Sequence, residues 1–340
     1  MFIEITADYD LDSLHKKLHA VRNYSIDVYL SHSFEGGLFL SFDPDKKWVK
    51  DKIMFFDAVH KQCEKATFPP ERIHIRWGNL NASEMYEQWC FYNNPVGRFG
   101  SVEAVNELLT QVNKPTTVLM TAQESLPQKL FTYLNSAQRK HREDALNYIY
   151  ENDLLDMCEW TWFNDWHYNL NEHFHTLIPK SAEGFEWKGK PVADESVYAF
   201  SEELLDMYSN TCFDLISETF YHHDVHHYDE FAYMDTVYIT EKTWRSILIK
   251  RPFLLIGNKH SLKQLHALGF KTFPMLFDES YDTLGDGKRL GHVLAQLNGF
   301  SVESMFAKIN TAEVQDILEH NLQQALKLSQ KMVDIRNKML

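Results

Sequence analysis

The residues of this chain best suited to chemistry are a glutamate and a lysine, Glu241 and Lys242, directly after Thr240. Thr240 is a good helix N-cap residue. The apolar residues that follow have the i, i+3, i+4 spacing of one helix face: Trp244, Ile247 and Leu248. We therefore expect a helix that opens on Glu241 and Lys242. Its N-terminus offers free backbone N–H groups and a partial positive charge, which suit a phosphate.

The two charged side chains extend this chemistry. Lys242 adds a full cation in the first turn, where the helix dipole alone disfavours one. Glu241 beside it could accept both hydroxyls of a ribose. An acceptor for a sugar next to a donor for a phosphate describes a nucleotide site. The alternative is an exposed helix start, where charged residues are common.

A second group of cations lies between an expected strand, Leu130–Leu134, and an expected helix, Lys140–Glu151. Arg139 and Arg142 surround the first turn of that helix, where cations oppose the helix dipole unless an anion lies between them. The alternative is that Arg139 pairs with Glu143 at i, i+4 and faces water. The spacing leaves both readings open, and either arginine fits an anion site.

Several sequence motifs together resemble a known family. They are Thr240-Glu-Lys242, Pro252-Phe-Leu-Leu-Ile-Gly257, Leu268-Gly-Phe-Lys-Thr-Phe273 and Phe277-Asp-Glu-Ser-Tyr-Asp282. In this order they resemble the donor-binding region of fucosyltransferase-like glycosyltransferases of the GT-B fold, in a branch met in bacteriophages and marine bacteria. The resemblance is clearest from about Leu130 to Leu297, and the preceding residues resemble the branch only loosely.

The resemblance implies an α/β protein with two Rossmann-like domains facing a central cleft. It implies an acceptor domain at 1–125, a donor domain at 126–315 and a C-terminal helix at 316–340 that packs across both. The implied reaction is transfer of a sugar from a nucleotide-diphosphate sugar to a hydroxyl acceptor. No metal and no cofactor besides the donor is expected, because side chains and helix ends stabilise the leaving diphosphate in such enzymes.

The resemblance also implies roles for individual residues. Glu241 recognises the ribose, Lys242 neutralises the diphosphate, and Arg139 or Arg142 supplies a further diphosphate contact. Thr240, the first residue of the Thr-Glu-Lys motif, is expected among the donor-binding residues as well as capping the helix. Glu218, directly after an expected strand at Thr211–Ser217, matches a position where related enzymes touch the nucleotide, and is a secondary candidate.

A general base for inverting transfer should come from the first domain. His32 and Glu35 follow an expected strand, and Gly36-Gly37 permits close approach of a substrate. The alternative is an ordinary turn with polar residues. Gly78-Asn79 is a second candidate acceptor loop. A retaining enzyme needs no such base, and the stereochemistry stays open.

The acceptor divides the hypothesis. A saccharide or lipid-linked glycan is the ordinary choice, and hydroxymethylcytosine in DNA is the rival because the branch is common in phages. DNA would demand base extrusion and a basic channel, whereas the chain has a formal net charge of −14. A protein that binds nucleotides or glycans without catalysis is the other class of explanation.

The composition sets further bounds. With 340 residues, 44% hydrophobic and 24% charged, the chain suits two globular domains of ordinary size. No apolar run approaches a membrane span and no signal peptide is evident, so we expect a cytoplasmic protein. The four cysteines lack CxxC spacing, which favours free buried thiols. His222-His-Asp-Val-His-His227 could supply metal ligands, but a solvated or donor-adjacent loop is the preferred reading.

The elements that position these residues follow from apolar patterning. Expected strands are Phe2–Ile5, Ile26–Leu30, Leu38–Phe42, Ile73–Trp77, Leu130–Leu134, Glu159–Phe163, Thr211–Ser217 and Phe253–Ile256, with a strand-like approach from Val237 to the 241 helix. Expected helices are Lys50–Cys63, Ser83–Phe91, Val102–Val112, Lys140–Glu151, Ser201–Ser209, His260–Leu268, Lys288–Leu297 and one from Thr311 to the end. Neither GxGxxG nor GxxxxGK[ST] occurs, so hydride transfer and P-loop hydrolysis lack their usual signature.

Overall fold

The computed structural model of the chain describes most of its residues. The described residues are 1–4, 8–32, 54–77, 82–93, 95–104, 125–135, 139–162, 202–219, 221, 237 and 239–338.

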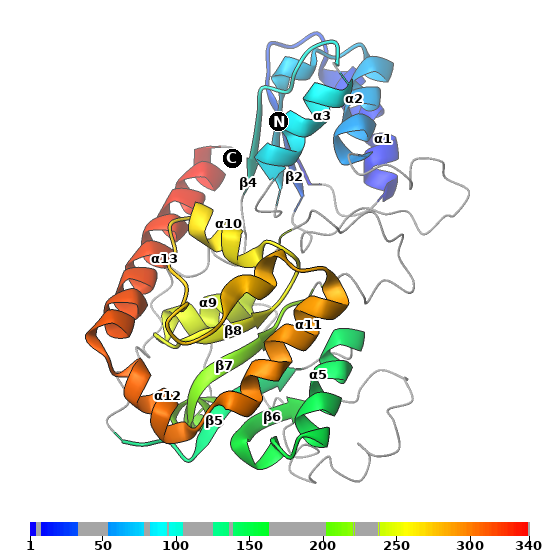
Figure 1. The fold of residues 1–340 in the computed structure, drawn as a ribbon. Coiled ribbons are helices and arrows are strands. Elements are labelled where there is room, and N and C mark those ends of the chain that lie inside the picture. Colours follow the sequence, from blue (N-terminus) through cyan, green and yellow to red (C-terminus); the bar gives the residue numbers. More distant parts are fainter. Residues whose placement is uncertain are drawn as a thin grey trace. The chain divides into compact units, whose positions relative to one another are not determined.

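The chain folds into two compact units (Figure 1). The first comprises Met1–Thr110, Val225–Ile239 and Gln330–Leu340, and the second comprises Gln111–Asp224 and Thr240–Ser329. Neither unit is one continuous stretch of sequence, whereas the predicted domains are. That the units face a cleft, and that the last helix packs across both, stay predictions.

The first unit is built on a parallel sheet of four strands in the order β1-β2-β3-β4. The strands are β1 (Phe2–Glu4), β2 (Val28–His32), β3 (Ile73–Trp77) and β4 (Ser101–Ala104). The helices are α1 (Asp8–Val21), α2 (Met54–Ala66) and α3 (Ala82–Asn93). An aromatic cluster fills its core, where the rings of Trp89 and Phe99 stack with centroids 5.8 Å apart.

The second unit is built on a parallel sheet in the order β6-β5-β7-β8. The strands are β5 (Lys129–Asn135), β6 (Cys158–Trp162), β7 (Thr211–Ser217) and β8 (Phe253–Ile256). The helices are α5 (Lys140–Glu151), α8 (Glu202–Ser209), α9 (Glu241–Leu248), α10 (Ser261–Ala267), α11 (Asp286–Ala295), α12 (Val302–Ile309) and α13 (Ala312–Lys338). From Gln330 onward α13 belongs to the first unit. Each unit thus has Rossmann-like α/β architecture, which confirms the predicted fold class.

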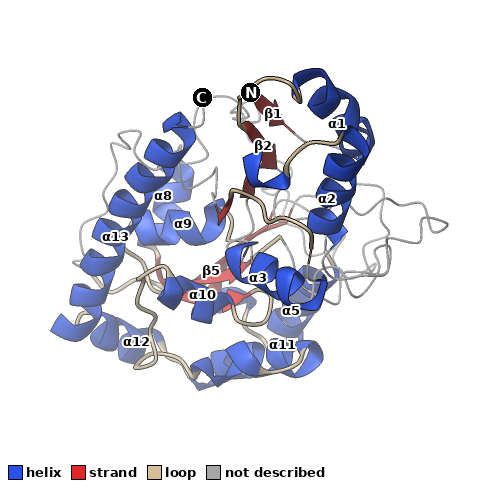
Figure 2. Cartoon of the chain, turned by 90° about the horizontal axis from the view of Figure 1, so that it is seen from above, coloured by secondary structure: helices blue, strands red, loops and turns tan. Residues whose placement is uncertain are grey.

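Helices cover both faces of the second sheet. Helices α5 and α11 lie side by side on one face, and α8 and α9 lie on the other (Figures 1 and 2). Strand β7 is buried along its whole length because both of its faces are covered, and its apolar residues accordingly point to both faces. Phe213 contributes to the core by packing edge-on against Phe277, with ring centroids 5.1 Å apart.

Some sequence-based predictions of elements are wrong. The helix predicted at Val102–Val112 is contradicted at its start, because Val102 lies in strand β4 and pairs with Ile75 of β3. This four-residue strand is formed by pairing with its neighbour, which local apolar spacing does not reveal. Strand β2 extends to His32, so His32 ends the strand and is not part of the loop. Val237 and Ile239 are buried but are not in a strand.

Other predictions lie outside the described residues or are confirmed. The strand predicted at Leu38–Phe42 lies outside them. All four cysteines are free and buried, as predicted: Cys63, Cys90, Cys158 and Cys212. Within the described part of the chain, no helix combines the length and apolar character that a membrane crossing requires.

Candidate functional site at the carboxyl edge of the second sheet

The strand order of the second sheet marks one place on its edge for a ligand. From β5 the chain proceeds to β6 on one side, and β7 then returns to the other side of β5. The carboxyl ends of β5 and β7 therefore form a topological switch point, where connections diverge and parallel α/β sheets bind ligands. The described strands of the first sheet follow one another in sequence order and form no such point.

Helix α9 begins beside this edge, and the predicted cap is confirmed. Thr240 has an extended backbone, and its side chain accepts a hydrogen bond from Lys242 N at 3.4 Å. The Thr240 side chain is fully buried. It therefore shapes the start of α9.

Glu218 holds the start of α9 in place. Its carboxylate accepts hydrogen bonds from Thr240 N at 3.1 Å, from the Thr240 hydroxyl, and from the Thr243 hydroxyl at 2.5 Å. Only 1% of Glu218 is exposed. Burial raises its pKa, against the opposing effects of Lys242 and the two hydroxyls. The Glu218 carboxylate is thus hydrogen-bonded to other groups of the protein, at the position that the sequence suggests for nucleotide contact.

Glu241 and Lys242 form an ion pair in the first turn of α9. Lys242 Nζ lies 2.7 Å from Glu241 Oε1 and 3.3 Å from Thr240 Oγ1. The side chains are 16% exposed for Lys242 and 23% for Glu241, so solvent reaches both. Burial alone would raise the pKa of Glu241, but the Lys242 charge and hydrogen bond, with Arg245, lower it to about 2. Glu241 is therefore an ionised acceptor at neutral pH.

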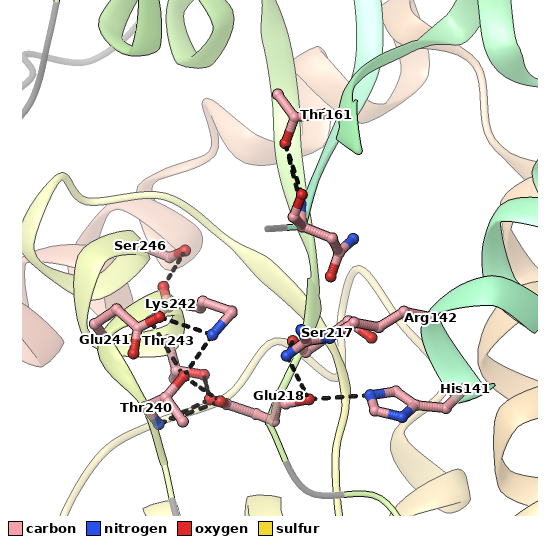
Figure 3. A network of polar contacts seen from close by, with 11 residues as sticks. His141, Arg142, Thr161, Ser217, Glu218, Thr240, Glu241, Lys242, Thr243 and Ser246 are labelled. Atoms are coloured by element: carbon pink, nitrogen blue, oxygen red, sulfur yellow. Dashed lines mark hydrogen bonds and ion pairs between the residues drawn. The ribbon is translucent and has the colours of Figure 1, made fainter. Parts of the chain in front are cut away.

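Arg142 approaches the end of β7 from the side opposite Lys242 (Figure 3). Its Nη2 donates to the carbonyl of Ser217 at 3.3 Å and to that of Glu218 at 3.1 Å. Only 2% of the residue is exposed. His141, its neighbour in α5, has Nε2 3.0 Å from the Glu218 carbonyl. These contacts tie α5 to the end of β7.

Arg139 has a different environment. It stands at the N-cap position of α5 with extended backbone and no side-chain cap, and it is partly buried. Its Nε is buried without a hydrogen-bond partner in the described part of the chain. Arg139 thus has unused hydrogen-bonding capacity at the start of α5.

Sequence reasoning missed Asn135, which ends β5, and at Ser217-Glu218 it selected Glu218 and not Ser217, which ends β7. Asn135 and Ser217 are 2% and 1% exposed. Neither amide atom of Asn135 nor Ser217 Oγ has a hydrogen bond of normal geometry among the described residues. The signal that could have found them is their position, since each is a polar residue at the carboxyl end of a predicted apolar strand.

The remaining candidates are placed only in part. His32 ends β2, and nothing is described of its side chain. Glu35, Gly78-Asn79 and the histidine segment 222–227 lie outside the described residues. Among the residues that are described, no group of three or more histidine, cysteine or acidic side chains could hold a metal ion.

Comparison with known proteins adds little to this geometry. No protein-family model and no curated protein matches the chain. Among solved structures, the chain is similar to the "Crystal Structure of T4 phage BGT in complex with its UDP-glucose substrate", with a TM-score of 0.40 and 10% identity. The match covers 96% of this chain and 76% of that chain. At this TM-score the likeness carries no argument about fold or function.

Proposed function

We propose that the protein is a glycosyltransferase whose second unit binds a nucleotide-diphosphate sugar at the carboxyl edge of its sheet. The observation that carries this proposal is the pairing of an ionised Glu241 with Lys242 in the first turn of α9, beside a topological switch point. The motifs that resemble glycosyltransferases support the type of reaction.

The residues take the following roles. Lys242 and the start of α9 contact the diphosphate, and Glu241 accepts hydrogen bonds from ribose hydroxyls. Arg139 is the second cation of the site, because Arg142 is buried and already bonded to two carbonyls. Glu218 and Thr240 hold α9 in position and do not touch the donor.

The reaction breaks the bond between the anomeric carbon of the sugar and the diphosphate oxygen, and forms a bond from that carbon to the acceptor oxygen. Both bonding electrons leave with the diphosphate, so negative charge grows on it in the transition state. Lys242 and Arg139 stabilise that charge. The acceptor proton passes to a base, for which His32 and Glu35 of the first unit remain the candidates in an inverting reaction.

A saccharide or glycan is the acceptor that we favour over hydroxymethylcytosine in DNA. The net charge of −14 opposes the phosphate contacts on which DNA binding depends. A protein that binds the donor without turnover is the competing function. It would bind nucleoside diphosphates but release no diphosphate from any sugar conjugate, with or without saccharide acceptors.

The test is binding of ADP, CDP, GDP and UDP and of their glucose conjugates, measured by calorimetry and by the melting temperature. We expect at least one pair to bind, and Lys242→Ala to weaken binding 10-fold or more because the diphosphate loses a charged contact. Lys263→Ala is the matched control. Lys263 is also a lysine in the first turn of a helix, α10. The backbone N–H groups of Leu262 and Lys263 in that turn already donate to the Asp282 carboxylate, at 3.0 and 3.1 Å. Equal binding by the two variants would remove Lys242 from the site.

A further inference from the structure

Two buried polar side chains lie next to each other at the switch point. Thr132 of β5 pairs with Asp214 of β7, and the same register continued for three residues places Asn135 level with Ser217. Both lie beside the Tyr133 hydroxyl, which donates to the Arg142 carbonyl at 2.9 Å. Neither has a hydrogen bond of normal geometry within the described residues.

The Tyr133 hydroxyl donates its proton to Arg142, so it can accept a hydrogen bond from this pair but cannot donate to the Asn135 oxygen. Asn135 N donates to the Thr161 hydroxyl at 3.1 Å, and the Ser217 carbonyl accepts from Arg142. A buried amide or hydroxyl without a partner costs about 1–3 kcal/mol, and such groups are rare in folded proteins. Two of them side by side, where a parallel sheet binds its ligand, indicate groups that are satisfied by a ligand.

The chemistry of the pair restricts what that ligand presents. The Asn135 amide carries an acceptor as well as donors, and the Ser217 hydroxyl can do both. A phosphate only accepts at neutral pH, so it would leave the Asn135 oxygen unsatisfied. A sugar hydroxyl both donates and accepts, and it can satisfy both side chains.

We propose that Asn135 and Ser217 bind hydroxyl groups of the sugar part of the donor, forming an uncharged half of the site beside Lys242 and Arg139. This inference rests on the proposed function, because it assumes a nucleotide-sugar donor. The hydroxyls belong either to the ribose or to the transferred sugar, and both offer the same chemistry.

The test uses one substitution that should weaken binding without lowering the stability of the ligand-free protein. Asn135→Leu removes two unsatisfied buried atoms at similar volume, so the melting temperature of the ligand-free protein should rise or stay unchanged. The same change should weaken binding of the nucleoside diphosphate glucose 10-fold or more, because the sugar hydroxyls lose their partner. Ser217→Ala should act in the same directions with a smaller loss.

The matched control is Asn321→Leu in α13. Asn321 is 1% exposed, and its amide accepts from Lys271 N and donates to Lys271 O, both at 2.8 Å. This variant should melt at a lower temperature, with no loss of affinity in the molecules that fold. If Asn135→Leu lowers the melting temperature as Asn321→Leu does, or leaves affinity unchanged, the inference is wrong.

Two further ligand series identify the source of the hydroxyls. A loss confined to the glucose conjugates assigns the pair to the transferred sugar. An equal loss for conjugates and free diphosphates, together with weak binding of 2′-deoxynucleotides by the wild type, assigns it to the ribose. Failure of the wild type to bind any nucleotide would end the proposed function as well, whereas normal binding by Asn135→Leu would end only this inference.

Discussion

Glu241 and Lys242 show how neighbouring charges prepare a side chain for its role. The ion pair keeps Glu241 ionised far below the usual pKa of a glutamate. An acceptor that stays ionised at neutral pH can receive two hydroxyl donors at once, which a protonated carboxyl cannot.

The lowered pKa of Glu241 leads to a prediction on stability. Because the folded-state pKa of about 2 lies below the ordinary 4.5, this carboxylate stabilises the fold above pH 4.5, and the contribution declines as the pH falls toward 2. We expect Glu241→Gln to lower the free energy of unfolding by about 1–2 kcal/mol at pH 6, since the pair is partly exposed. Urea unfolding at several pH values should show that the difference in free energy of unfolding between variant and wild type becomes smaller toward pH 3. A difference independent of pH would contradict this account.

Residue types alone left the roles of several charged residues open. Arg139 and Arg142 are three positions apart and carry the same charge, yet Arg142 is bonded to two carbonyls of the β7 end. Likewise, nothing in the type of Glu218 says that its carboxylate points to Thr240. The partner of each charged side chain depends on which backbone carbonyl and N–H groups of neighbouring elements remain unpaired. Tertiary packing alone determines those groups.

At the scale of elements, the sequence motifs that carry the family resemblance act largely as internal supports. Glu279 accepts from Phe273 N and from the Thr272 hydroxyl, each at 2.7 Å, and so fixes the turn after α10. Gly269, just after α10, has φ +87°, a conformation that favours glycine. Asp282 holds the first turn of α10. These contacts all lie within the protein and shape the region next to β8.

The support role of Asp282 predicts a loss of stability without a loss of binding. Asp282→Ala leaves the N–H groups of Leu262 and Lys263 without their carboxylate, which should cost about 1–2 kcal/mol. Affinity for the nucleoside diphosphates should stay within twofold of the wild type, by calorimetry below the melting temperature. A tenfold loss of affinity with normal stability would instead place Asp282 in the binding site.

Buried strands and amphipathic helices were the elements best predicted from the sequence. The bounds of β3, β7, β8 and α5 are as predicted, because apolar runs and helical spacing are strong there. Strand β4 was predicted as a helix, and α1 was not predicted at all. Short edge strands gain their stability from a partner strand, so local sequence carries little of that information.

At the scale of the whole molecule, net charge bears on the proposed class of acceptor. A formal charge of −14 repels polyanions at long range, and released counterions supply most of the affinity for DNA. We expect no gel shift of a hydroxymethylcytosine duplex at physiological salt, and sugar transfer to saccharide acceptors instead. A shift that weakens steeply as salt increases, with label transferred to the duplex, would assign the DNA substrate.

The four buried thiols have a practical consequence. Burial raises the pKa of Cys63 to about 12 and that of Cys212 to about 11, so neither is a reactive thiolate while its unit is folded. Cys63 and Cys90 belong to the first unit, and Cys158 and Cys212 to the second. Alkylation by a maleimide, followed by mass spectrometry of each peptide, would therefore record the opening of the two units separately in the unmodified protein. The natural sequence thus carries two internal reporters for each half of the molecule.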